Sequence, residues 1–150
     1  PAELVEKIIA SSQYHAAYAC IRQLSFGMLD MAWHTTTALV EDPMAFETVA
    51  LASTQVLPVV EGTALSPQFS HIFSGGYASG YYSYKWAEVL DADAFAAFKE
   101  NGIFDQETAR SFRENVLSRG GTENPMELYK RFRGHEPSID ALMRRDGIVK

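Results

Sequence analysis

The sequence predicts an all-α fold, and three observations support this prediction. Apolar residues recur every three to four positions in most segments. Start and stop signals such as Asp42-Pro43, Asn124-Pro125 and Gly134 bound these segments. No segment alternates apolar and polar residues between hairpin turns, as strands would. With 150 residues, 47% of them hydrophobic, the chain fits one domain or a piece of a larger one.

The first half is expected to form two helices and a loop. One apolar stripe runs over residues 4–34 and predicts a single long helix. Asp42 is expected to cap a second helix, with Pro43 at its first position and an end near Leu57. From Val59 to Ser70 there is no periodicity, which predicts a loop.

Four helices are expected after this loop, each between recognisable start and stop signals. Their predicted ranges are 82 to about 99, 105–120, 124–134 and 137–147. In the first of them, Tyr82, Trp86 and Val89 are expected to pack inward, while the opposite side is richer in phenols.

Charge and composition exclude several classes of partner. The formal net charge is −6, and the basic residues are scattered, so neither nucleic acid nor an anionic membrane surface is an expected partner. No stretch reaches the roughly 18 apolar residues of a membrane span, and no signal peptide is evident, so we expect a soluble, cytoplasmic protein. Cys20 is the single cysteine and is expected to be buried and inert.

The segment from His71 to Trp86 is the best candidate for a functional site. It holds one imidazole, four phenols and three glycines. The imidazole and the phenols donate and accept protons and hydrogen bonds. Tyr77, Tyr81 and Tyr84 would share one face if their backbone were helical. An aromatic stripe of this kind can also be core, but burying three phenols would require three hydroxyl partners.

These residues resemble the substrate-side motif of the thimet oligopeptidase-like zinc metallopeptidases. The resemblance extends to Arg22-Gln23-Leu24 and Leu29-Asp30-Met31, and from Arg119-Gly120-Gly121 to Glu136-Pro137, so it covers nearly the whole chain. It is strongest for the bacterial branch that contains oligopeptidase A and peptidyl-dipeptidase, and we favour the dipeptidase.

The resemblance implies a place and a role for this chain. Residues 1–150 would be a multi-helical, C-terminal part of a larger metallopeptidase catalytic domain that hydrolyses short peptides. Tyr77 and Tyr84 would stabilise the oxyanion of the reaction, and zinc would be the cofactor of the full-length enzyme. The substrate-binding residues would be His71, Gly75, Gly76 and Tyr81.

The zinc-binding motif of that family, H-E-x-x-H, is absent from this sequence. His135-Glu136 begins like it, but Pro137 follows and no second histidine comes one turn later. The chain begins at Pro1 without methionine, so we expect it to be cut from a longer protein. Alone, it is expected to bind no zinc and to be inactive. The missing N-terminal part is its expected partner, and self-association could cover the apolar surface left open.

Alternative interpretations remain for each of these features. His71 could cap the loop that contains it instead of binding substrate. A basic cluster could clamp the carboxylate of a substrate terminus; its members are Lys130, Arg131, Arg133, Arg144 and Arg145. The whole chain could be a stand-alone helical module that binds peptides or partners without catalysis.

Overall fold

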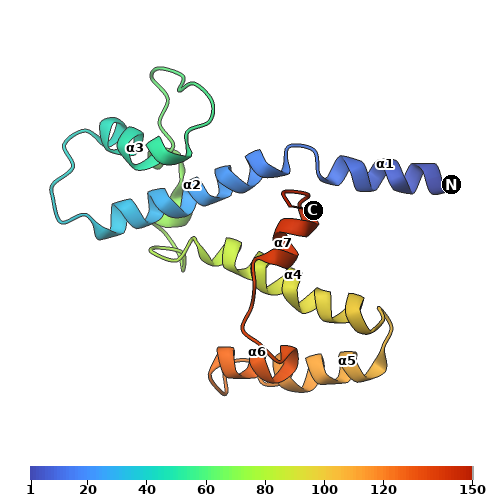
Figure 1. The fold of residues 1–150 in the computed structure, drawn as a ribbon. Coiled ribbons are helices and arrows are strands. Elements are labelled where there is room, and N and C mark those ends of the chain that lie inside the picture. Colours follow the sequence, from blue (N-terminus) through green and yellow to red (C-terminus); the bar gives the residue numbers. More distant parts are fainter. Residues whose placement is uncertain (150) are drawn as a thin grey trace. The chain divides into compact units, whose positions relative to one another are not determined.

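The computed structural model describes residues 1–149, and in that range it contains helices and turns but no strand (Figure 1). The prediction of an all-α fold is therefore confirmed. The chain divides into two compact units, Pro1–Trp86 and Ala87 onward. The candidate site lies entirely in the first unit.

The first unit contains three α-helices: α1 (Ala2–Ser12), α2 (Ala16–Thr35) and α3 (Pro43–Leu51). Asp42 caps α3 as predicted, because its carboxylate accepts hydrogen bonds from the backbone N–H of Met44 and Ala45. The helix ends earlier than predicted, at Leu51, and only a 3₁₀ turn follows it to Thr54. Two further 3₁₀ turns, Ser66–Gln68 and Ser70–Ile72, interrupt the long segment that leads to α4.

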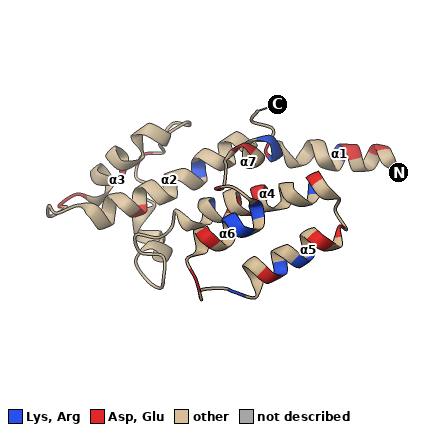
Figure 2. Cartoon of the chain, turned by 60° about the horizontal axis from the view of Figure 1, so that its bottom comes forward, with Lys and Arg blue, Asp and Glu red and all other residues tan. Residues whose placement is uncertain are grey.

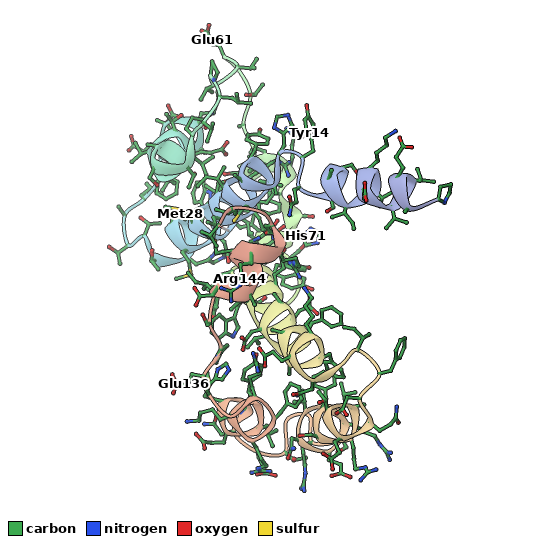
Figure 3. The ribbon with its side chains drawn as sticks, turned by 45° about the vertical axis from the view of Figure 1, so that its right-hand side comes forward. Tyr14, Met28, Glu61, His71, Glu136 and Arg144 are labelled. Carbon is green, nitrogen blue, oxygen red and sulfur yellow. The ribbon has the colours of Figure 1, made fainter. Side chains whose placement is uncertain are left out.

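The single long helix predicted over residues 4–34 is wrong, because the chain breaks between α1 and α2. His15 adopts a left-handed backbone with φ of 56°, which no helix can continue through. Just before the break, the hydroxyl of Ser11 donates to the carbonyl of Ile8 at 2.8 Å. Ser12 does the same to the carbonyl three residues before it. Hydroxyls that bond to nearby carbonyls favour helix ends. Tyr14 marks this junction in Figure 3.

Helices α2 and α3 pack through aromatic rings, and a buried carboxylate attaches the following loop to them. The rings of Trp33 and Phe46 lie 4.3 Å apart. Glu47, which is buried, accepts hydrogen bonds from the backbone N–H of Leu65 and Ser66 and from the Ser66 hydroxyl, each at 2.7 Å. Trp33 donates its indole N–H to the same hydroxyl at 2.9 Å. The loop is therefore held at its C-terminal end, at Leu65 and Ser66, while Glu61 lies at its tip (Figure 3).

The second unit contains most of α4 (Ser83–Asn101), then α5 (Gln106–Phe112), a π-helical turn (Arg113–Leu117), α6 (Pro125–Arg133) and α7 (Asp140–Arg145). Their start and stop signals act as predicted. Asp105 caps α5 and Asn124 caps α6, and α6 ends at Gly134 with φ of 84°. α7 starts three residues later than Pro137, the predicted opening residue.

The core of this unit combines small apolar contacts with a buried hydrogen bond. Val89, Ala92 and Leu142 form a buried cluster. Asp93 is also buried, and the hydroxyl of Tyr129 donates to its carboxylate at 2.7 Å. This hydrogen bond, together with burial, raises the pKa of Tyr129, so the phenol stays neutral.

Several predicted positions of side chains need correction. Tyr82 and Trp86 were expected to pack inward, but they are 60% and 43% exposed. Tyr82 lies just before α4, which begins at Ser83, and Trp86 lies on a partly exposed side of the first turn of that helix. Cys20, expected to be buried, is half-buried.

Apolar surface is exposed on α1. Leu4, Val5, Ile8 and Ile9 are each more than half exposed, and α1 buries no residue. Self-association through such a surface stays a prediction. In the part of the chain from residue 1 to 149, no helix combines the length and apolar character that crossing a membrane requires.

We predict that Tyr129→Phe lowers the free energy of unfolding by about 1–3 kcal/mol, because Asp93 would keep its burial and lose its donor. Urea denaturation followed by circular dichroism measures this change. Tyr14→Phe is the matched control, since Tyr14 is an exposed phenol in the other unit. Equal stability of the two variants would contradict this account of the core.

Candidate functional site

The candidate site is built on turns, not on a helix. The backbone from Phe73 to Tyr82 follows a series of bends and turns, and α4 starts at Ser83. The condition under which Tyr77, Tyr81 and Tyr84 would share one helical face is therefore not met. The turns nevertheless bring the three phenols together.

Four rings form a cluster in which every member has a ring neighbour, and we call His71, Tyr77, Tyr81 and Tyr84 the ring cluster. The rings of Tyr77 and Tyr84 stack with centroids 4.9 Å apart. Tyr81 lies 5.0 Å from Tyr84 and 6.4 Å from Tyr77, and His71 lies 5.8 Å from Tyr77. The structure thus brings close together the four side chains that the sequence analysis predicted to be catalytic or substrate-binding.

The ring cluster is accessible, which argues against the interpretation as core. Tyr77 and Tyr84 are 36% and 37% exposed, and His71 is exposed on the segment between α3 and α4 (Figure 3). Within residues 1–149, His71 makes ring contacts with Phe69, Tyr77 and Tyr81 but no side-chain hydrogen bond. The geometry therefore does not support a loop-capping role, and the imidazole can bind another molecule.

Two phenylalanines that the sequence analysis did not single out pack against the ring cluster through Tyr81. Phe69 packs on Tyr81 with centroids 5.0 Å apart, and Phe26 of α2 packs on Phe69 at 5.1 Å. Phe26 also meets Tyr81 edge to face at 5.9 Å. These contacts connect the cluster to α2, and they fix the plane of the Tyr81 ring.

A buried acid of α2, also missed by the sequence analysis, holds the backbone of the site. Asp30 is fully buried, and its carboxylate accepts hydrogen bonds from the N–H of Ser79 and of Tyr81, both at 2.9 Å. His34, one turn further along α2, places Nδ1 2.9 Å from the same carboxylate. Figure 2 shows how little charge α2 carries; Asp30 and Arg22 are its two charged residues. An acid within an apolar helical face, with histidine four residues later, is the signal that could have revealed it.

The glycines of the segment serve the backbone in different ways. Gly75 has φ of 95°, which favours glycine, and no atom lies within 4 Å of where a side chain would begin at Gly75 or Gly76. The space beside both is open. Their expected contact with substrate stays a prediction.

Electrostatics keep one phenol of the ring cluster protonated. The hydrogen bond with Tyr77 is the largest cause that raises the pKa of Tyr84, to about 12, followed by desolvation and by the neighbouring phenols. A hydrogen bond raises a phenol's pKa when the phenol donates it, because ionisation removes the donor. The hydroxyls of Tyr77 and Tyr84 therefore interact, and Tyr84 stays neutral above the ordinary range of a phenol.

No residue of this chain is assigned as a metal ligand. Among residues 1–149, no three His, Cys, Asp or Glu side chains gather where they could hold a metal ion. The residues present therefore do not fit a zinc site on their own.

Four of the five residues of the basic cluster are paired with acids of the chain, which argues against an open clamp for a carboxylate. Arg133 binds Glu100 through two hydrogen bonds, and Arg145 pairs with Asp91 at 2.9 Å. Lys130 and Arg131 likewise pair with glutamates. Figure 2 shows these charges of both signs on α6.

The sequence of this chain matches one protein family and is similar to several curated proteins. The model of peptidase family M3 matches residues 1–148. Oligopeptidase A of Escherichia coli is 48% identical over 150 residues, which are 99% of this chain and 22% of that protein. The probable cytosolic oligopeptidase A of Arabidopsis thaliana is 40% identical over 159 residues, with the same shares. The dipeptidyl carboxypeptidase of Salmonella typhimurium is 38% identical over 151 residues, again with the same shares. The chain thus spans about a fifth of the length of the curated relatives it matches.

We predict that Tyr77→Phe lowers the pKa of Tyr84 from about 12 towards its ordinary value of 10.0, because Tyr84 loses the acceptor of its proton. At about pH 10.5, Tyr84 should be largely neutral in the original chain and largely ionised in the variant. NMR of ¹³Cζ-labelled tyrosine measures this difference. Tyr14→Phe should leave the Tyr84 signal unchanged, and an identical titration in Tyr77→Phe would refute the hydrogen bond.

Proposed function

Because the chain belongs to peptidase family M3, we propose that it is the C-terminal part of the catalytic domain of a zinc-dependent oligopeptidase that hydrolyses short peptides. The observation that carries this proposal is the accessible ring cluster, which lies within the matched residues and keeps Tyr84 protonated. Zinc, when bound by the rest of the enzyme, polarises the scissile carbonyl and activates water. The residues of this chain supply hydrogen bonds.

In this proposal, Tyr77 and Tyr84 stabilise the negative charge that develops on the carbonyl oxygen as water adds. A phenol held about 2.7–3.1 Å from that oxygen donates a hydrogen bond that strengthens with the charge. Tyr84 keeps its proton in the substrate-free chain, because its neighbours raise its pKa to about 12. The pair acts as one donor unit that draws electron density away from the substrate.

The other members of the site bind the peptide in this proposal. The His71 imidazole has no hydrogen bond within the described residues and can bond to the substrate backbone. Tyr81, packed on Phe69, presents its hydroxyl from a fixed ring. Gly75 and Gly76 leave space for the peptide main chain beside the loop.

The mode of cleavage is the finer part of the proposal. Relatives named oligopeptidase A share up to 48% identity with the chain, and those named dipeptidyl carboxypeptidase share up to 38%. This difference supports cleavage of the oligopeptidase A type over the release of C-terminal dipeptides. One relative is named cytosolic and another chloroplastic or mitochondrial, so a cytoplasmic location stays a prediction.

We predict that Tyr77→Phe and Tyr84→Phe in the full-length enzyme each lower kcat by about 100-fold, the effect typical of losing one oxyanion donor. KM and zinc content should change little, because neither hydroxyl is expected to bind the metal or the ground state strongly. Steady-state kinetics with a fluorogenic peptide and metal analysis measure the three quantities. Tyr82→Phe is the matched control, since Tyr82 is an exposed phenol outside the ring cluster. An unchanged kcat/KM in Tyr84→Phe would remove its role as donor.

We predict that this chain alone cleaves no peptide, and that co-expression with an upstream segment carrying H-E-x-x-H restores cleavage, because the ring cluster contains no metal ligands. Mass spectrometry of the products, with free and amidated peptide C-termini, measures activity and the mode of cleavage. A release of C-terminal dipeptides from free termini alone would restore the dipeptidase interpretation. A chain that binds peptides by itself, with no cleavage after co-expression, would instead support the stand-alone binding module.

A further inference from the structure

We propose that Asp30 is a positioning residue for the ring cluster, through the two backbone amides that its carboxylate holds. This proposal deepens the proposed function and rests on it for the kinetic part alone. Asp30 touches no substrate-facing side chain of the cluster. It acts through the turn that carries Tyr77, Tyr81 and Tyr84.

Both carboxylate oxygens of Asp30 are engaged by the same turn. Oδ1 accepts from the N–H of Ser79, and Oδ2 accepts from the N–H of Tyr81, each at 2.9 Å. Ser79 has a left-handed φ of 57°, uncommon for a residue with a side chain. Successive N–H groups converge on an anion where the backbone changes hand in this way. Two bonds to amides two residues apart fix both the position and the orientation of the turn.

His34 lies next to the carboxylate of Asp30 and supports its position. Its Nδ1 lies 2.9 Å from Oδ1 of Asp30 and 2.8 Å from the carbonyl oxygen of the same residue. Both of these atoms are acceptors, so Nδ1 carries a hydrogen. Asp30 has no exposed surface, and a buried carboxylate is stable only when its oxygens are satisfied. The two amides satisfy one oxygen each, and His34 lies beside the carboxylate while it bonds to the carbonyl of the same residue.

The position of Tyr81 connects this anchor to the ring cluster. Its N–H is bound to Asp30, and its ring packs on Phe69 and Tyr84 at 5.0 Å each. A shift of the turn therefore moves the Tyr81 ring against Tyr84 and disturbs the stacked pair of Tyr84 and Tyr77. A displacement of about 1 Å at such a site can cost about 100-fold in rate.

An amide cannot replace this carboxylate. Asparagine has nearly the same shape but offers one acceptor oxygen and one N–H₂ donor. In Asp30→Asn the N–H₂ would face the N–H of Ser79 or of Tyr81, and one of the two bonds would be lost. The change is therefore close to isosteric, and it acts on the turn.

Glu47→Gln is a matched control for a purely structural effect. Glu47 is also a buried acid of the first unit, and it also accepts hydrogen bonds from two backbone N–H groups of a loop. Those groups belong to Leu65 and Ser66, outside the ring cluster. Both variants are expected to lose stability, and only Asp30→Asn is expected to alter the phenols.

The test has a spectroscopic arm and a kinetic arm, both in the full-length protein that carries this chain. With ¹⁵N-labelled serine and with tyrosine labelled with ¹⁵N and ¹³Cζ, Asp30→Asn should shift the amide signals of Ser79 and Tyr81 and the ring signals of Tyr77 and Tyr84, and Glu47→Gln should not. In the kinetic arm, Asp30→Asn should lower kcat roughly 10- to 100-fold with KM nearly unchanged. Glu47→Gln should keep kcat within about threefold of the original.

The two arms separate the failure of this proposal from that of the proposed function. Ring signals that are identical in Asp30→Asn and the original protein would overturn the positioning role, whatever the activity. Shifted ring signals in a protein without peptidase activity would support the positioning role and reject the peptidase. If Asp30→Asn does not fold, His34→Ala decides, since it keeps the acceptor and removes the ring whose Nδ1 lies 2.9 Å from it. Its expected result is a smaller shift of the same signals, and no shift would overturn the proposal.

Discussion

The buried carboxylate of Asp30 holds the first unit and its site together. It lies on a long helix, and the amides that it binds come 49 and 51 residues later in the chain. The turn from Phe73 to Tyr82 has no regular backbone pairing of its own, so its N–H groups need acceptors from elsewhere. Asp30 supplies two of them. The phenols of the ring cluster lie side by side because Asp30 holds this turn in one position.

Glu47 holds the preceding loop in the same way, with a buried carboxylate that accepts hydrogen bonds from backbone amides. Two acids on two helices each receive a pair of backbone amides, and Trp33 joins them by donating to Ser66 while it packs on α3. The arrangement explains how a segment of some thirty residues, with only short 3₁₀ turns, can carry a defined site. Side-chain acceptors replace the regular hydrogen bonds that helices provide for themselves.

The sequence predicted the parts of this fold that depend on local signals. Asp42, Asp105 and Asn124 cap helices as expected because capping needs only the next three residues. The break at His15 was missed because its apolar stripe continues across it, and a left-handed residue other than glycine leaves no mark in the pattern. The start of α4 at Ser83 lies one residue after the predicted start at Tyr82. The geometry of the turn before it was not predicted, because Asp30 holds that turn through contacts that span about fifty residues.

The candidate site was predicted in its members and not in its geometry. The glycines and phenols pointed to the right segment, and the resemblance pointed to the role of Tyr77 and Tyr84. A helical row would have placed the hydroxyls along one line, each with its own access to a ligand. The turn instead stacks Tyr77 on Tyr84, and this neighbour raises the pKa of Tyr84. Asp30 left a weak signal, an acid in an apolar helical face, but its partners could not be predicted because they come about fifty residues later. Phe69 was missed because it acts through tertiary ring contacts alone.

This pairing changes what the two phenols can do in the proposed reaction. Each hydroxyl has one proton to donate, and the raised pKa of Tyr84 keeps its proton in place. Stabilisation of an oxyanion then depends on the pair, because the two rings stack and their hydroxyls interact. The neutral form of Tyr84 is protected well above physiological pH. A donor of this kind keeps its proton throughout the reaction, which suits a site that must stabilise charge without accepting it.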